Sequence, residues 1–351
     1  MIVRPRPHWL HLLFVRRGSL LWRILPQQLT ALAIALGVAL AHGTLWHWKV
    51  PLNAGVFSLM GVSLAIFLGF RINASYDRWW EARKLWGGVL IACRNLGRHA
   101  LTLLDVPPAV ASVRPATVPG VPARRVLDAA TGRTSVPASG AGAGTVVPDG
   151  PVPADHPGRP LVLGLMAFAA AMRNQLRGLP ADQALAGLLP AGLLARLPGE
   201  ANPPLAIGLW LGRQLAAQRA AGRLDPWLAA QMEDTLDDLL AAWGSCERIA
   251  VTPLPFTYGV ILHRSVYTYC LLLPFGLVDA IGLATPLVVG FVSYTFFALE
   301  ALSDEIEEPF GLAPNDLPLD ALVHGVQRSL WQLLGEPVPA PLPLVDGYLQ
   351  Q

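Results

Sequence analysis

The chain has 351 residues, of which 53% are hydrophobic and only 14% are charged, and its mean hydropathy is +0.44. Soluble domains usually carry about 25% charged residues, so this composition excludes an ordinary soluble protein. The formal net charge of +2 gives no basic surface of the kind that nucleic acids require, so we expect a membrane protein that binds no nucleic acid.

Two long apolar segments follow the basic N-terminal region, at residues 25–45 and 52–70. Each is uncharged through its centre and about as long as the roughly 20 apolar residues that span a bilayer. Trp46 and Trp48 lie between the two segments, and tryptophan is enriched where lipid meets water. The pattern predicts two transmembrane helices joined by a short loop.

The middle of the chain contains a low-complexity segment followed by two segments with helical patterns. Residues 105–160 are rich in Pro, Ala, Val and Gly, and such a segment cannot bury enough apolar surface to offset its ordering entropy. We expect a disordered cytosolic insertion there. The apolar run of residues 161–177 is too short to span a membrane, which predicts a packed cytosolic helix. Residues 226–245 predict a half-buried helix with an apolar stripe of Leu228, Met232, Leu236, Leu239 and Trp243.

A second pair of apolar segments occupies residues 265–283 and 286–302, with Thr285-Pro286 marking the turn between them. Each holds one charged residue, Asp279 or Glu300, near an end, so no convergent polar site is visible within the spans. The sequence lacks strand-like alternation, and the expected fold class is all-α. The expected regions are 1–104 with the first two spans, the insertion 105–160, a cytosolic helical region 161–256, the last two spans 257–303 and a cytosolic C-terminal segment 304–351.

Lys and Arg are distributed unevenly around the first two spans. Five arginines precede the first span and six basic residues lie within 71–98 after the second, whereas the loop between the spans holds only Lys49. Because basic residues stay on the cytoplasmic side, both termini and the middle of the chain are expected in the cytoplasm. The expected location is therefore the inner (cell) membrane, crossed several times.

The second span carries two adjacent rows at four-residue spacing: Gly61, Ala65 and Gly69, and one position on, Val62, Ile66 and Phe70. A row of small residues lets membrane helices approach closely. In a ring of identical helices, the small row would contact the neighbouring copy while the bulky row pointed to the axis. Rings of apolar side chains there would form a narrow constriction that gates ions by dewetting. The alternative is that the bulky row faces lipid or packs in a core.

Several short motifs accompany these spans in a fixed order: Arg17-Gly18-Ser19, the run 77–81 (DRWWE), Thr252-Pro253-Leu254-Pro255 with Tyr258, Pro274-Phe275-Gly276, Glu308-Pro309-Phe310-Gly311 and residues 315–319 (NDLPL). Together they resemble the bestrophin family, most closely its bacterial branch. The resemblance covers residues 9–104 and about 161–325, and the segment 105–160 departs from it as an insertion.

The resemblance implies a homopentamer around one central pore, with four membrane helices per subunit and a large cytosolic helical part. The hydrophobic neck of the family matches Val62, Ile66 and Phe70 in position. A second, cytosolic aperture formed by one apolar residue falls at Trp227 or Leu228 in this chain. From its residue type and neighbours, Asp77 is expected to be a structural ion-pair partner, for example of an arginine, rather than a selectivity group.

Animal relatives also bind Ca²⁺ in a clasp whose acidic ligands map near Glu305, Glu308, Ala313 and Asp316. Ca²⁺ takes about six to eight oxygen ligands, and Ala313 offers no side-chain oxygen, so the set is incomplete. The expectation for the acidic run 304–308 is a solvated helix end. We therefore expect no cofactor, with Ca²⁺ at most a weak ligand of Glu305, Glu308 and Asp316.

The expected function is passive ion conduction rather than catalysis, because the sequence has no Ser/His/Asp set, phosphate-binding glycine loop or HExxH motif. Animal bestrophins conduct chloride, whereas bacterial relatives resemble cation-conducting channels. The neck is uncharged, so chloride conduction and monovalent-cation conduction both stay open. The alternative function is a non-conducting membrane scaffold or regulatory membrane protein. The expected partners are further copies of the chain, membrane lipid and inorganic ions.

Overall fold

The computed structural model describes residues 1–2, 10, 15, 18–41, 44–45, 48–49, 54–104, 150–180 and 185–350. Helices dominate these ranges, which confirms the all-α expectation. The regular strands described are β1 (Thr44–Leu45) and β2 (Trp48–Lys49), a two-residue antiparallel pair with Thr44 opposite Lys49. This hairpin joins the first two long helices.

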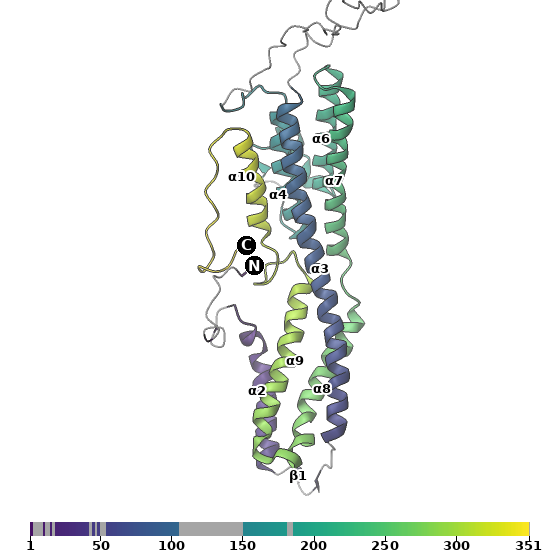
Figure 1. The fold of residues 1–351 in the computed structure, drawn as a ribbon, viewed down its shortest axis with the longest axis vertical. Helices are drawn as coiled ribbons and strands as arrows, with labels where there is room; N and C mark the ends of the chain where they lie inside the picture. The colour runs from purple at the N-terminus through teal and green to yellow at the C-terminus, as the bar shows by residue number, and fades with distance from the viewer. Residues whose placement is uncertain are drawn as a thin grey trace, which may run out of the picture.

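Four helical segments form an apolar bundle at the lower end of the molecule in Figure 1: α2 (Leu21–Leu40), the first part of α3 (Ala54–Thr102), α8 (Phe256–Ile281) and α9 (Thr285–Glu307). Their shared core includes Phe57, Tyr269 and Phe297. By length and composition, three helical stretches among the described residues could cross a membrane: Leu21–Leu40, Gly55–Thr102 and Phe256–Glu307. The last stretch contains both α8 and α9, which are joined by the 3-10 helix η3 (Gly282–Ala284) and pack against each other.

The turn between α8 and α9 lies earlier than the sequence suggested. Gly282 has φ +54°, a left-handed conformation that glycine adopts without steric cost, and it ends α8. Thr285 and Pro286, expected in the turn, instead open α9. Proline suits the first turn of a helix, because its missing N–H would have no intrahelical acceptor there.

Polar and small residues hold the apolar bundle together. The Gln28 side chain of α2 donates to the Gly290 carbonyl oxygen of α9 at 2.8 Å and accepts from the Ser293 hydroxyl at 3.2 Å. Gly276 of α8 lies directly against Phe57 of α3, since a Cβ at that glycine would come within 2.3 Å of the ring. Buried polar bonds and small residues at helix contacts are both typical of packed membrane helices.

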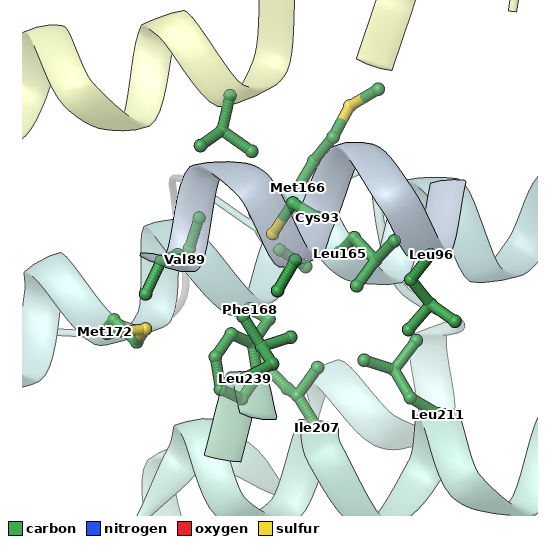
Figure 2. Packing of buried hydrophobic residues seen from close by; sticks show 14 of the residues in the cluster. Val89, Cys93, Leu96, Leu165, Met166, Phe168, Met172, Ile207, Leu211 and Leu239 are labelled. Atoms are coloured by element: carbon green, nitrogen blue, oxygen red, sulfur yellow. The ribbon is translucent and has the colours of Figure 1, made fainter. Parts of the chain in front are cut away.

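A second bundle forms the upper part of the molecule from the remainder of α3, α4 (Arg159–Leu176), α6 (Pro203–Ala220), α7 (Pro226–Val251) and α10 (Leu319–Leu333). The short α5 (Ala191–Leu194) and η2 (Leu197–Gly199) precede α6. Residues 164–172 of α4 are all buried, and Figure 2 shows Phe168 and Leu165 surrounded by side chains of α3, α6 and α7. An all-round apolar sequence is what a central helix requires, so the packed helix expected at 161–177 is present.

The helices of the second bundle begin where the sequence supplies capping groups. The Asn202 side chain accepts from the Leu205 N–H at the start of α6, and the Asp225 side chain accepts from the Trp227 N–H at the start of α7. Such side-chain acceptors satisfy N–H groups that have no intrahelical partner. The predicted stripe of α7 faces the core, with Leu228 half-buried and the rest buried: Met232, Leu236, Leu239 and Trp243.

Residues 150–160, expected to belong to the disordered insertion, make defined contacts with the second bundle. The Val152 N–H donates to the Leu334 carbonyl oxygen at 2.8 Å, and the Val152 side chain packs against the core of the second bundle. Arg159, already the first residue of α4, forms an ion pair with Glu336. Residues 150–160 are therefore ordered by contacts with the end of α10, while 105–149 lie outside the described residues.

Candidate functional site

Helix α3 links the two bundles and has two chemically different faces. It contains 49 residues, which corresponds to about 70 Å at 1.5 Å per residue. One face is buried along the whole length, from Leu64 and Leu68 in the apolar bundle to Trp86 and Val89 in the second bundle. The opposite face is exposed over the same length. The rotation of α3 about its axis therefore decides which residues this chain presents outward.

Polar contacts on the buried face fix that rotation. The Arg71 guanidinium lies 2.5 Å from Asp304 and 3.3 Å from Glu307, both on α9. One turn further, the hydroxyls of Ser75 and Ser303 are 3.0 Å apart. Arg78 donates from Nε to the Glu307 carbonyl oxygen at 3.0 Å and makes two further bonds to carbonyl oxygens at the end of α7. Three consecutive inward turns are thus attached to the rest of the fold.

The exposed face carries the residues expected to form the neck. Val62, Ile66 and Phe70 are 57%, 54% and 63% exposed. At about 100° per residue, Arg71 points about 180° away from Val62, about 140° from Ile66 and about 100° from Phe70. Because all four residues lie on one helix, holding Arg71 on the buried face turns the neck row to the exposed face. The position of this row at a pore axis stays a prediction.

The row of small residues is divided between two surroundings. A Cβ at Gly61 would come within 2.6 Å of the Tyr269 hydroxyl of α8, so this glycine packs within its own chain. A Cβ at Gly69 would meet no atom within 4 Å, and Ala65 is exposed. The reason is that positions four apart drift by about 40° around an α-helix. Gly61 therefore falls beside α8, while Gly69 has rotated onto the open face.

The two candidates for the second aperture lie at the start of α7, the end of that helix remote from the apolar bundle (Figure 1). Trp227 is 74% exposed, whereas Leu228 packs against the core of the second bundle. Of the pair, Trp227 has the side chain that is available to line an aperture.

A pocket that contains several charged side chains lies where α3, α8 and α9 meet, and the sequence did not indicate it. Its volume is about 440 Å³, and Arg71, Arg264 and Asp304 are among its lining residues. Within it, His263 Nδ1 lies 2.7 Å from Glu300 Oε1, and the Glu300 side chain is only 6% exposed. Of these residues only Glu300 lies within the apolar segments expected to span the membrane, so the pocket is at the boundary of the spans. No sequence signal links these two residues, because the α8–α9 hairpin brings them together across 37 positions.

The acidic residues expected at a weak Ca²⁺ site have other structural roles. Glu305 accepts from the Asn315 N–H at 2.9 Å, and Asp316 accepts from the Ala313 N–H at 2.7 Å. Both carboxylates are buried, so the expected solvated helix end is wrong for Glu305, while Glu308 is exposed. Within the described ranges, no three His, Cys, Asp or Glu residues are arranged to hold a metal ion.

Apolar helices of spanning length, joined by one long helix to a second helical bundle, define a helical membrane protein. The chain belongs to the bestrophin family of bacteria and fungi, because the family model described as "Bacterial/Fungal Bestrophin protein" matches residues 1–125 and 143–332. The resemblance drawn from the short motifs is thus confirmed. The family model leaves out 126–142, which is a smaller insertion than the expected 105–160.

Sequence similarity to known proteins covers almost the whole chain. A protein of Ralstonia nicotianae named voltage-dependent anion channel-forming protein RSc3414 is 39% identical over 340 residues, covering 96% of this chain and 95% of that protein. The voltage-dependent anion channel-forming protein YneE of Escherichia coli K12 is 37% identical and covers 100% of this chain and 99% of its own length. A crystal structure of a bacterial bestrophin homolog from Klebsiella pneumoniae aligns with a TM-score of 0.72 at 33% identity, over 90% of this chain and 99% of that chain.

Proposed function

We propose that this chain is one subunit of a homopentameric ion channel in the inner membrane, which conducts inorganic ions passively along a central pore. Each subunit crosses the bilayer four times, through α2, the first part of α3, α8 and α9. Both termini and the second bundle lie in the cytoplasm, as the distribution of Lys and Arg indicates. The adjacent positions of Met1, which donates to the Gln350 carbonyl oxygen at 2.5 Å, support one common side for the two termini.

The observation that carries this proposal is the exposed apolar row on α3. Val62, Ile66 and Phe70 project from a helix whose opposite face is anchored by Arg71. Exposed apolar residues on a membrane helix can face lipid, but this row lies on the one helix whose exposed face, among the described residues, continues from the apolar bundle into the second bundle. Five copies of α3 around an axis would bring the rows together as three stacked apolar rings. A constriction of this kind excludes water and gates ions without a charged group.

The neck is uncharged, so it sets a barrier for ions of either sign. The relatives reported above are named for anion channels, and anion conduction is the expectation that the family gives. Any preference between anions and cations must then come from charged groups elsewhere along the path.

Replacement of Val62, Ile66 and Phe70 together by alanine tests the neck. The smaller side chains widen the constriction and admit water, so ion flux should rise roughly tenfold if the barrier falls by about 1.4 kcal/mol. The measurement is ion flux into liposomes that contain purified protein of verified oligomeric state. Phe291→Ala on α9 is the matched control, because Phe291 is 74% exposed in the same bundle but lies on another helix.

Three results would count against the proposal. Flux that stays at the level of empty liposomes for every variant would favour a non-conducting scaffold. Conduction that Phe291→Ala changes as much as the triple variant does would show that the row on α3 is not the gate. Recovery of the purified protein as a monomer would exclude the ring of subunits on which the pore depends.

A further inference from the structure

The exposed face of α3 does not end at the neck. It continues without interruption into the second bundle, and its outward residues follow one another at three- or four-residue steps: Leu59, Val62, Ile66, Phe70, Asn73, Asp77, Trp80, Lys84, Gly88 and Ile91. All of them are exposed. The chemistry changes abruptly within this stripe, because the residues up to Phe70 are apolar and those that follow first are Asn73 and Asp77.

Helix geometry places Asp77 in line with the neck. It is seven residues after Phe70 and eleven after Ile66, and both separations lie within about 20° of a whole number of turns. Along the axis it is about 10 Å beyond Phe70, at 1.5 Å per residue. The helix is continuous between these positions. Any arrangement of copies that turns Ile66 and Phe70 toward a shared axis therefore turns Asp77 toward the same axis.

Asp77 makes no ion pair within the described part of the chain, so the expected pairing with an arginine is not found there. Arg78 is directed to carbonyl oxygens on the opposite face of α3, and Arg71 is paired with α9. The carboxylate of Glu81, four residues on, is held instead by Arg248 of α7 at 2.6 Å. Asp77 is thus the first charged side chain after the neck that the fold leaves facing outward.

We propose that five Asp77 carboxylates form a ring on the cytoplasmic side of the neck, which concentrates inorganic cations and repels anions at the inner mouth of the constriction. This inference rests on the proposed pentamer with α3 along its axis. It assigns a selectivity role to a residue outside the apolar neck, and it acts against the anion preference that the relatives' names suggest.

The next charged residue on the stripe is Lys84, again seven positions and about 10 Å further along the helix. That separation exceeds the Debye length of about 8 Å at physiological ionic strength, so the two rings act largely independently in a water-filled vestibule. The Asp77 ring lies beside the narrow, low-dielectric neck, where a charge has more influence on a passing ion. Asp77 should therefore dominate the choice of ion.

The test is the ratio of K⁺ to Cl⁻ permeability, obtained from reversal potentials in a KCl gradient across bilayers that contain the full-length protein. Asp77→Asn should lower this ratio by about fivefold, because a cation at the mouth loses stabilisation of about 1 kcal/mol. Glu81→Gln removes the same charge one turn away, on the side held by α7, and should leave the ratio unchanged. Equal ratios for Asp77→Asn, Glu81→Gln and the unmodified chain would overturn the inference.

A second variant keeps the test decisive if Asp77→Asn assembles poorly. The three native cysteines are buried, so Asp77→Cys adds a single accessible thiol. A negatively charged methanethiosulfonate reagent applied from the cytoplasmic side should restore the cation preference, and a positively charged reagent should reverse it. Identical currents with both reagents, after labelling is verified by mass, would contradict the ring. Complete absence of current in the unmodified protein would instead refute the channel.

Discussion

Phe70 and Arg71 are neighbours in the sequence but lie on different faces of α3, Phe70 exposed and Arg71 buried. Successive residues of an α-helix are about 100° apart, so one step takes the chain from the exposed face of α3 to the buried one. Arg71 is 7% exposed and is held by Asp304 and Glu307. Removing both carboxylates would leave a buried guanidinium without a counter-charge, which costs several kcal/mol. The two inward ion pairs of Arg71 thereby help to determine where the adjacent aromatic ring points.

Asp316, in the loop between α9 and α10, is a buried acid whose pKa is shifted far enough to make stability depend on pH. Burial raises the pKa of Asp316 to about 6, the Ala313 N–H bond lowers it in part, and the negative charge of Glu305 adds to the rise. Its Oδ1 atom is buried without a hydrogen-bond partner among the described residues. The folded protein therefore prefers the protonated acid at this position.

We predict that stability falls as pH rises toward neutrality and through the folded-state value. Between about pH 4 and pH 6 the folded state binds a proton that the unfolded chain has released, so stability is highest at the acidic side and declines until pH passes 6. The contribution is at most about 3 kcal/mol, from two pKa units. Asp316→Asn has no proton to lose, so its Tm in detergent should differ less between pH 5 and pH 7.5. A pH dependence equal to that of the unmodified chain would show that another group is responsible.

At the scale of the element, α3 is the helix that connects the two bundles without a break. No proline occurs between Ala54 and Thr102, so nothing interrupts its hydrogen-bond ladder where the apolar segment ends. The hydropathy pattern predicted a span that stops at residue 70, but the inward positions continue at the same spacing through Ala82 and Trp86. The helix extends beyond the apolar bundle because its buried face packs into a second core, formed with α4, α7 and α10.

The two glycines of the small row should respond differently to the same substitution. Gly61→Leu drives a side chain into Tyr269 of α8, and overpacking of this kind costs about 1–3 kcal/mol, so the Tm of the isolated subunit should fall. At Gly69, by contrast, an added Cβ would meet no atom within 4 Å. Gly69→Leu should leave that Tm unchanged but weaken assembly, because the open face of α3 meets the neighbouring copy.

Thermal unfolding and gel filtration in detergent separate these effects. If Gly69→Leu assembles as the unmodified chain does, close packing between copies at this row is wrong. A normal Tm for Gly61→Leu would mean that α3 and α8 can separate locally without cost.

At the scale of the whole molecule, two cores share one helix. The apolar bundle has its own cluster around Tyr269 and Phe297, and the second bundle has a larger one around α4. The termini meet beside each other, with Ile2 bridged to Leu349. Since α3 runs through both cores, it is a direct path by which a change in one bundle can reach the other, beside the α7–α8 and α9–α10 connections.

Removal of residues 126–142 should leave the assembly and the Tm unchanged, because the family model omits this segment. A deletion of 126–155 should lower the Tm, since it also removes the Val152 contact with the end of α10. Gel filtration and thermal unfolding of both variants check this pair of outcomes. Loss of the oligomer on removal of 126–142 alone would show that the insertion takes part in assembly.

The sequence by itself determined the membrane class, the helical fold, the apolar segments and the family, because hydropathy and short motifs are local properties of the chain. It also placed Val62, Ile66 and Phe70 on one row. Only the tertiary structure decided that this row is exposed, because the rotation of α3 depends on partners in α9 that are more than 230 positions away. The His263–Glu300 pair, the burial of Glu305 and the outward position of Asp77 were hidden for the same reason: each depends on which helices pack together, and no local pattern records that.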